Sequence, residues 1–124
     1  MNDKPKILYV DDEEINQVLL KINLSKTYDV ITASNGPEGL EILNNIPEIK
    51  LVASDMKMPI MNGIEFIKKA KKIHTQLPFF LITGFDITPQ IIEAMNSQLI
   101  IKHFKKPFNI IEIQAVFLKV ISKS

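Results

Sequence analysis

The sequence predicts an α/β fold built on a doubly wound, five-stranded parallel sheet with five helices. Short apolar runs alternate five times with longer segments of helical periodicity, which is typical of parallel strands joined by crossover helices. The runs are short, mostly apolar and often β-branched, as expected for strands covered on both faces. A chain of 124 residues with 46% hydrophobic content can bury a full core, so we expect one domain rather than two.

The strands and the first helix are predicted directly from this alternation. Asp12 is a candidate N-cap for the first helix. Four apolar residues at helical spacing predict the core-facing side of that helix, namely Ile15, Val18, Leu19 and Ile22. The predicted strands occupy residues 7–10, 30–33, 51–54, 79–83 and about 100–104.

Capping residues and prolines mark the other four helices. Asn35-Gly36-Pro37 opens the second helix and Pro47 ends it. Asn62-Gly63 opens the third, Thr88-Pro89 gives the fourth a cap and a first-turn proline, and the fifth follows Asn109. The predicted core-facing residues are Leu40, Leu43 and Ile46 in the second helix, Ile64, Ile67, Ala70 and Ile73 in the third, and Ile110, Ile113, Val116, Phe117 and Val120 in the fifth.

Composition excludes several classes of function. Fifteen Lys and Arg balance fourteen Asp and Glu, so no overall field favours binding to nucleic acid or to an anionic membrane. The absence of cysteine removes disulfides, thiolate metal sites and a cysteine nucleophile. The amino terminus lacks the apolar stretch of a secretory signal, and no apolar run reaches membrane-spanning length. We therefore expect a cytoplasmic protein that does not bind nucleic acid or membranes.

Polar residues follow the predicted strands at the edge where a doubly wound sheet binds its ligand. Asp11 and Asp12 follow the first strand, Asp55 the third and Thr83 ends the fourth, while Lys106 closely follows the fifth. Three converging carboxylates repel one another unless a proton or a cation compensates their charge. Oxygen-only ligands favour Mg²⁺. For the pair Asp11 and Asp12 alone, the start of a helix is an equally good explanation.

Asp55 is a candidate nucleophile, because it ends an apolar strand without being a helix cap or a partner in an obvious local ion pair. A carboxylate can attack a phosphoryl group if cations neutralise the charge on the transferring oxygens. Mg²⁺ and Lys106 would supply that charge, and the Thr83 hydroxyl could donate to a phosphoryl oxygen. Thr83 and Lys106 also have ordinary interpretations, as a turn residue and as a solvated side chain. Their joint placement after successive strands favours a functional site.

Four segments in order resemble the receiver domains of bacterial two-component response regulators, the CheY-like family. They are Tyr9-Val10-Asp11-Asp12-Glu13, residues 55–63 from Asp55 to Gly63, Ile82-Thr83-Gly84, and Lys106-Pro107-Phe108. The resemblance covers about residues 5–122. It implies that residues 1–124 form a single receiver domain with a flavodoxin-like strand order of 2-1-3-4-5.

The resemblance also implies a chemistry. Asp55 would accept phosphate from a histidine kinase or a histidine phosphotransfer protein. Asp12 and Asp55 would bind Mg²⁺ directly, Asp11 mainly through water, and the main-chain carbonyl of Lys57 would be a further ligand. Members of the family also phosphorylate themselves from small donors and dephosphorylate themselves, so we expect a signalling domain rather than a metabolic enzyme.

The implied output is a switch. Phosphate on Asp55 would draw in the Thr83 hydroxyl, and a side chain of the fifth strand would fill the vacated space. That position holds His103, where tyrosine or phenylalanine is commoner. We consider two interpretations, a pH-dependent switch and a ring that simply packs. The resemblance further implies a cis bond before Pro107, and a partner surface on the fourth helix, fifth strand and fifth helix that could also serve a phosphorylation-dependent homodimer.

Two departures from the family and three rival functions stay open. Lys57, two residues after Asp55, means that the lifetime of the acyl phosphate is not predicted from relatives. Gln98-Leu99 stands where relatives usually carry the glycine of a helix cap, so the end of the fourth helix is not predicted either. A phosphohydrolase commonly has a carboxylate where Lys57 stands, and Asp11 and Asp12 would repel the phosphate of a flavin. A degenerate receiver would not need the complete acidic corner. No segment after Phe117 resembles a DNA-binding or catalytic unit, so we expect a stand-alone receiver of unidentified kinase and output.

Overall fold

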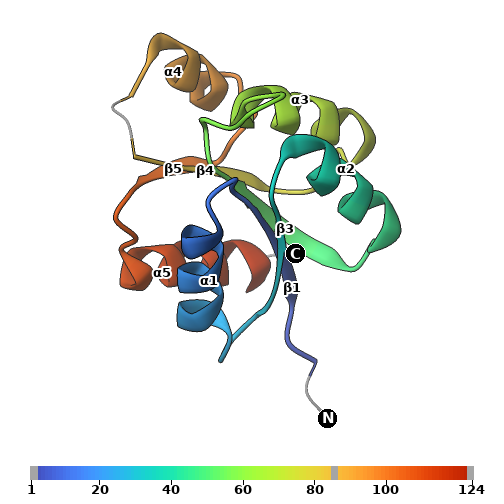
Figure 1. The fold of residues 1–124 in the computed structure, drawn as a ribbon, viewed down its shortest axis with the longest axis vertical. Helices are drawn as coiled ribbons and strands as arrows, with labels where there is room; N and C mark the ends of the chain where they lie inside the picture. The colour runs from blue at the N-terminus through green and yellow to red at the C-terminus, as the bar shows by residue number, and fades with distance from the viewer. Residues whose placement is uncertain (1–2, 85–86, 123–124) are drawn as a thin grey trace.

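The computed structural model describes residues 3–84 and 87–122, in which five strands alternate with five helices (Figure 1). The strands are parallel and lie in the order β2-β1-β3-β4-β5, which confirms the predicted topology. The elements are β1 (Lys6–Val10), α1 (Glu14–Leu24), β2 (Asp29–Ala33), α2 (Gly36–Asn45), β3 (Ile49–Ser54), α3 (Gly63–Ile73), β4 (Phe79–Thr83), α4 (Pro89–Asn96), β5 (Lys102–Lys105) and α5 (Ile110–Ser122).

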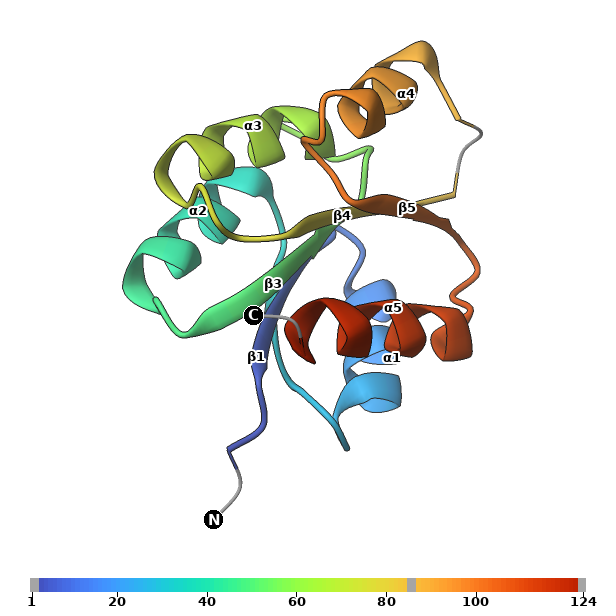
Figure 2. The ribbon, with the colours of Figure 1, turned by 180° about the vertical axis from the view of Figure 1, so that it is seen from behind.

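Helices cover both faces of the sheet, α1 and α5 on one side and α2, α3 and α4 on the other (Figures 1 and 2). Each face has its own core, because successive strand residues point to opposite sides. On the α1 and α5 side the rings of Phe80, Phe104 and Phe117 lie 5.1–6.1 Å apart between centroids. On the other side Leu8 and Val10 of β1 pack against residues of α2 and α3 such as Leu43 and Phe66. The sheet is therefore held rigidly from both sides.

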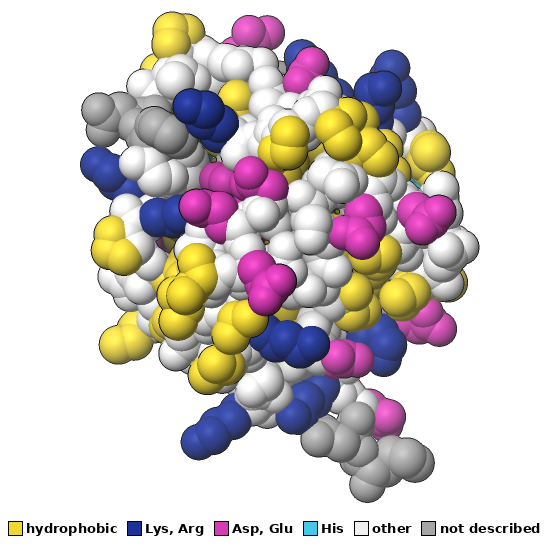
Figure 3. Space-filling model, viewed as in Figure 1, with side chains coloured by type: hydrophobic (Ala, Val, Ile, Leu, Met, Phe, Trp, Pro, Cys, Tyr) yellow, Lys and Arg dark blue, Asp and Glu magenta, His cyan; other side chains and the backbone are white. Residues whose placement is uncertain are grey.

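The predicted core face of α1 is wrong. Ile15 and Ile22 are 68% and 66% exposed, and Val18 and Leu19 are also exposed, whereas Leu20 and Leu24 are fully buried. The buried face also contains the partly buried Asn16 and Gln17, so its pattern is not apolar throughout. Gln17 can lie there because its side chain donates to backbone oxygens of the sheet. Hydrophobic side chains consequently gather on the outer surface over α1 (Figure 3).

Most predicted helix starts are confirmed, and the structure corrects one start and one core-facing residue. The side chains of Asn35, Asn62 and Thr88 accept from backbone N–H groups at the starts of α2, α3 and α4. The N-cap of α1 is Glu13 rather than Asp12, and it makes no side-chain capping bond. Ile73, predicted to face the core, is exposed because it lies in the last turn of α3 beyond the packed segment.

The turn between α4 and β5 forms without glycine. Gln98 adopts φ 64°, the left-handed conformation. The backbone N–H groups of Gln98 and Leu99 donate to the carbonyl oxygens of Met95 and Ala94, at 3.1 and 2.9 Å, which is a Schellman motif. The Ile101 N–H donates to the Phe79 carbonyl of β4 at 2.9 Å, and the strand β5 itself begins at Lys102 rather than near residue 100 as predicted. Within the described residues, no helix is long and apolar enough to cross a membrane.

Candidate functional site

Three carboxylates converge where β1 and β3 end. Asp11, Asp12 and Asp55 each offer an oxygen, and these atoms lie within 4.8 Å of one another. Backbone bonds to the neighbouring strands fix Asp55 and Asp11 at the strand ends. The Asp55 N–H donates to the Val10 carbonyl at 2.8 Å, and the Asp11 N–H donates to the Ala33 carbonyl at 3.0 Å. Asp11 is fully buried and Asp55 is 6% exposed, whereas Asp12 is exposed. The predicted convergence is therefore observed.

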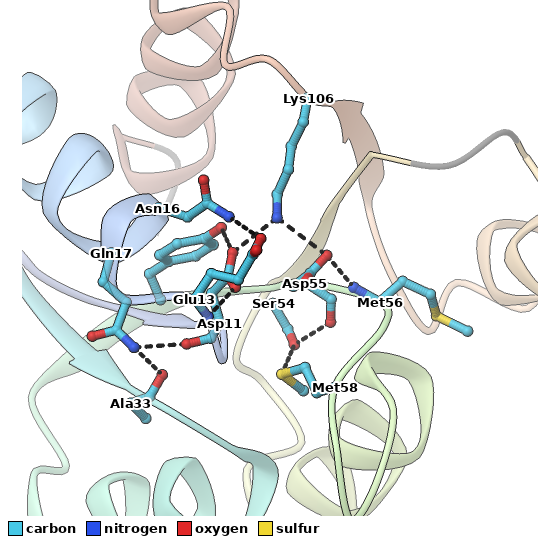
Figure 4. A network of polar contacts seen from close by, with 11 residues as sticks. Asp11, Glu13, Asn16, Gln17, Ala33, Ser54, Asp55, Met56, Met58 and Lys106 are labelled. Atoms are coloured by element: carbon cyan, nitrogen blue, oxygen red, sulfur yellow. Dashed lines mark hydrogen bonds and ion pairs between the residues drawn. The ribbon is translucent and has the colours of Figure 1, made fainter.

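Lys106 brings a positive charge to this corner from the other side (Figure 4). Its Nζ lies 2.9 Å from Asp11 Oδ2 and 3.5 Å from Asp55 Oδ1. A backbone hydrogen bond holds Lys106 beside the end of β4, because its N–H donates to the Thr83 carbonyl at 2.8 Å. The peptide bond between Lys106 and Pro107 is cis. One ammonium thus faces two buried carboxylates.

Asp11 has donors on both of its oxygens. The Tyr9 hydroxyl donates to Oδ2 at 2.5 Å, alongside Lys106, and the Glu13 N–H donates to Oδ1 at 2.9 Å. Burial, followed by the charge of Asp11, raises the pKa of Tyr9 well above its usual value, so the phenol stays neutral and can only donate to this carboxylate. Tyr9 lies on β1 two residues before Asp11, which directly follows the strand, so the extended chain directs both side chains to the same face.

The charge of Asp55 is not fully compensated. Burial, and then the charge of Asp11, raise the pKa of Asp55 to about 6, although Lys106 and the Met56 N–H both lower it. The Met56 N–H donates to Asp55 Oδ1 at 2.9 Å. A further cation beside these carboxylates would relieve the repulsion and favour the ionised, nucleophilic form.

The surroundings fit a hard divalent cation. A cavity of about 560 Å³ opens over Asp55, and its lining includes Asp12 and Glu13 on one side and Lys57 on the other. The charged groups that could coordinate a metal are carboxylates, the ligands that Mg²⁺ prefers. The cavity also has room for the waters that this ion retains. The remaining lining residues are Met58, Pro59, Gly84 and Lys106.

The β3–α3 turn passes tightly beneath Asp55. The Gly63 N–H donates to the Met56 carbonyl at 2.7 Å, and a Cβ on Gly63 would lie 2.2 Å from the Asp55 carbonyl oxygen. A side chain at this position would force the backbone of Asp55 to move. The glycine therefore allows α3 to begin directly behind the carboxylate.

The remaining predicted residues lie nearby in different environments. Thr83 is buried at the end of β4, the next strand along the sheet from Asp55. Lys57 is exposed on the rim of the cavity. His103 is half-buried on β5, and its Nδ1 lies 3.3 Å from Met95 Sδ of α4. The structure thus brings the acidic residues and Lys106 into direct contact range, while His103 contacts the outer helix.

Sequence reasoning missed two residues that hold Asp11. Tyr9 was part of a recognised segment but had no role of its own. Gln17 donates through Nε2 to the Asp11 carbonyl at 2.6 Å and to Ser34 Oγ at 3.2 Å, which ties α1 to the ends of β1 and β2. No sequence signal pointed to Gln17, because the apolar periodicity predicted the opposite face of α1 as the inner one. For Tyr9 the signal was its two-residue spacing from Asp11.

Known proteins share this fold and sequence pattern. The model of the response regulator receiver domain matches residues 7–117. Sporulation initiation phosphotransferase F from Bacillus subtilis is 36% identical over 115 residues, covering 92% of this chain and 90% of that protein. A response regulator receiver domain protein from Clostridium thermocellum has a TM-score of 0.87 and 30% identity, covering 95% of this chain and 94% of that chain.

Other relatives add context. Response regulator protein TrrA from Thermotoga maritima, solved in complex with Mg²⁺-BeF, has a TM-score of 0.80 and 28% identity, covering 93% of this chain and 97% of that chain. The transcriptional regulatory protein GlrR from Escherichia coli is 33% identical over 109 residues, which are 86% of this chain but only 24% of that protein. The family match over most of the chain, on the predicted sheet, shows that this chain belongs to the family of response regulator receiver domains.

Proposed function

We propose that this chain is a Mg²⁺-dependent phosphoacceptor that receives a phosphoryl group on Asp55 from a histidine kinase or a histidine phosphotransfer protein. The observation that carries the proposal is the meeting of Asp11, Asp12 and Asp55 with Lys106 at the carboxyl edge of the sheet. That arrangement combines a nucleophile with charges able to stabilise the transferring group.

The chemical step is an in-line displacement at phosphorus. A carboxylate oxygen of Asp55 attacks, the bond from phosphorus to the donor's imidazole nitrogen breaks, and the imidazole keeps the electron pair. Bound Mg²⁺ would supply positive charge for the phosphoryl oxygens. Lys106 supplies more, because its Nζ already lies 3.5 Å from Asp55. The same step with a small acyl phosphate, which releases a carboxylate, gives self-phosphorylation, and attack of water on the acyl phosphate gives self-dephosphorylation.

The residues that would hold Mg²⁺ follow from the family pattern and the donor set. Asp12 and Asp55 would bind it directly, and the main-chain carbonyl of Lys57, on the rim of the same cavity, would be a further ligand. Asp11 would act mainly through water, which is in keeping with its oxygens already accepting from Tyr9, Lys106 and Glu13.

The output surface is proposed on α4, β5 and α5. Thr83 at the end of β4 would follow the phosphoryl group, and His103 would move as space opens, leaving its contact with Met95. Exposed apolar side chains surround this region and suit a protein partner or a second copy of the chain. They are Ile92, Ile101, Ile111 and Leu118.

A different surface is suited to the phosphodonor. The donor must reach Asp55, so it must contact the rim of the site. The exposed residues Ile15, Leu19 and Ile22 of α1 form an apolar stripe on this side. A small cavity of about 260 Å³ joins Leu19 to Lys106 and Phe108. An amphipathic helix of the donor could lie along this stripe with its histidine over the cavity of the site.

Intact mass spectrometry after incubation with acetyl phosphate tests the proposal. We expect the parent to gain the mass of one phosphoryl group in the presence of Mg²⁺ and to lose that gain when Mg²⁺ is chelated. Asp55→Asn should show no gain. Asp29→Asn is the matched control, because Asp29 pairs with Lys6 at the far end of the sheet. Equal adducts on the parent and Asp55→Asn would overturn the assignment of the nucleophile.

The phosphohydrolase alternative predicts a different result. It requires continuous release of phosphate from small metabolites, with a second group acting as acid and base. Lys57 stands at the position where that acid and base commonly lies, and its side chain is exposed. A receiver also releases phosphate by self-dephosphorylation, but it does so through a covalent adduct on Asp55 that accumulates and is detected by intact mass.

A further inference from the structure

We propose that Tyr9 is a positioning residue whose hydroxyl keeps the buried Asp11 carboxylate bonded while Lys106 moves to the phosphoryl group on Asp55. The inference rests on the proposed function, because it assigns a role within that phosphorylation step. It concerns a residue that lies outside the predicted set of acidic ligands, hydroxyl and lysine.

Asp11 Oδ2 is shared by two donors in this structure. The Tyr9 hydroxyl lies 2.5 Å away. Lys106 Nζ lies 2.9 Å away, and Figure 4 shows it directed at Asp11. The third bond to this carboxylate, from the Glu13 N–H, goes to the other oxygen. Asp11 is fully buried in this structure, so its carboxylate depends on these protein donors for its hydrogen bonds.

Phosphorylation changes the demand on Lys106. Its Nζ is closer to Asp11 than to Asp55, at 2.9 against 3.5 Å, so stabilising a phosphoryl group on Asp55 requires it to shift away from Asp11. A buried carboxylate oxygen left without a donor is strongly destabilised. The Tyr9 hydroxyl remains on Oδ2 after Lys106 leaves, and so lowers the cost of the shift.

The tyrosine ring is held firmly enough to perform this role. Tyr9 is fully buried in the α1 and α5 core, and its ring packs edge-on against Phe108 with centroids 6.1 Å apart. Phe108 belongs to the same Lys106-Pro107-Phe108 segment as the lysine. The hydroxyl therefore cannot swing away from Asp11 when Lys106 moves.

Tyr9→Phe is the direct test, since it keeps the ring and removes only the hydroxyl. We expect phosphorylation by acetyl phosphate at saturating Mg²⁺ to slow about tenfold, equivalent to about 1.4 kcal/mol. Tyr28→Phe is the matched control, because the Tyr28 hydroxyl is buried without a hydrogen-bond partner among the described residues. Tyr28→Phe should phosphorylate at the parent rate.

Two readouts separate this role from a merely structural one. In a Lys106→Ala background, Tyr9→Phe should cause no further slowing of phosphorylation. No lysine then leaves Asp11 during the reaction, so the hydroxyl has no departure to compensate. By calorimetry without a phosphodonor, Tyr9→Phe should weaken the binding of beryllium fluoride with Mg²⁺ about tenfold, while Mg²⁺ alone binds within about twofold of the parent. Binding of Mg²⁺ alone should leave Lys106 on Asp11, so the Tyr9 hydroxyl is not the only donor to Oδ2 in that state.

The possible results are distinguishable. Parent-like phosphorylation and beryllium fluoride binding by Tyr9→Phe would overturn this inference and leave the proposed function intact. An equal loss in the Lys106→Ala background, or an equal loss of Mg²⁺ affinity, would also overturn it, because either result indicates general damage to the corner. A parent protein that takes no phosphate would instead contradict the proposed function.

Discussion

Asp55 is a carboxyl group whose ionisation its surroundings oppose. It is nearly buried, faces the fully buried Asp11, and is only partly compensated by Lys106. A further cation beside Lys106 would therefore favour the ionised form of Asp55 without destabilising the native state. The residue that we propose as nucleophile is thus also a source of instability in the metal-free protein.

A pH dependence of stability follows from the raised pKa. In the native state the pKa of Asp55 is about 6, against a value of 3.8 for an unperturbed group. Between these values the native state binds more protons than the unfolded state, so the free energy of unfolding falls as pH rises through this window. We expect Asp55 to contribute a loss on the order of 1–3 kcal/mol between about pH 4 and pH 7 without divalent cations.

Urea denaturation of the parent and Asp55→Asn, in chelator, measures this contribution. The difference in stability between the two proteins should grow in favour of Asp55→Asn as pH rises above about 4, and it should level off above about 6. A constant difference across that range would show that the native carboxyl titrates as in the unfolded chain. Added Mg²⁺ should reduce the difference at neutral pH.

At the scale of the element, α1 shows that a helix can place polar side chains toward the sheet and apolar ones toward solvent. Its outer stripe is apolar, whereas its inner face includes Gln17, which bonds the ends of β1 and β2. The apolar periodicity therefore predicted the wrong face. The caps of α2, α3 and α4 were predictable because Asn35, Asn62 and Thr88 act through local bonds. The start of β5 is not encoded in local sequence alone, whereas the two-residue spacing of Tyr9 and Asp11 predicts that both side chains lie on one face.

Substitutions on the two faces of α1 should separate packing from docking. Leu20→Ala removes a fully buried side chain and should cost about 2–5 kcal/mol of stability. Ile22→Ser alters a residue that is 66% exposed and should change stability by no more than about 0.5 kcal/mol. Urea denaturation of both variants checks this. A large cost for Ile22→Ser would indicate that the outer stripe is packed rather than available to a partner.

The α4–β5 turn holds a left-handed residue where glycine would be less strained. Gln98 has φ 64°, while its neighbour Ser97 has φ −82°. Gln98→Gly should therefore stabilise the protein by about 0.5–1 kcal/mol, because the steric strain at positive φ exceeds the entropy that glycine loses. Ser97→Gly is the matched control and should destabilise. Thermal unfolding of both variants distinguishes them, and destabilisation by Gln98→Gly would contradict the strain argument.

At the scale of the whole molecule, the site results from topology. Parallel strands place residues from distant parts of the sequence at one edge, so the order of strands and the position just after each strand were sufficient to predict that Asp11, Asp12, Asp55 and Lys106 would meet. The sequence could not predict which oxygen each donor contacts. Those contacts depend on the relative heights of the strand ends and on the packing of α1, which are properties of the assembled sheet.

The phosphoacceptor site is best tested by a crystal structure of the protein with Mg²⁺ and beryllium fluoride. We expect beryllium on a carboxylate oxygen of Asp55, Mg²⁺ in contact with Asp12, Asp55 and the Lys57 carbonyl, and Lys106 moved from Asp11 to a fluoride. Beryllium fluoride bound to another carboxylate, or a cavity over Asp55 that holds neither the metal nor the fluoride, would contradict it.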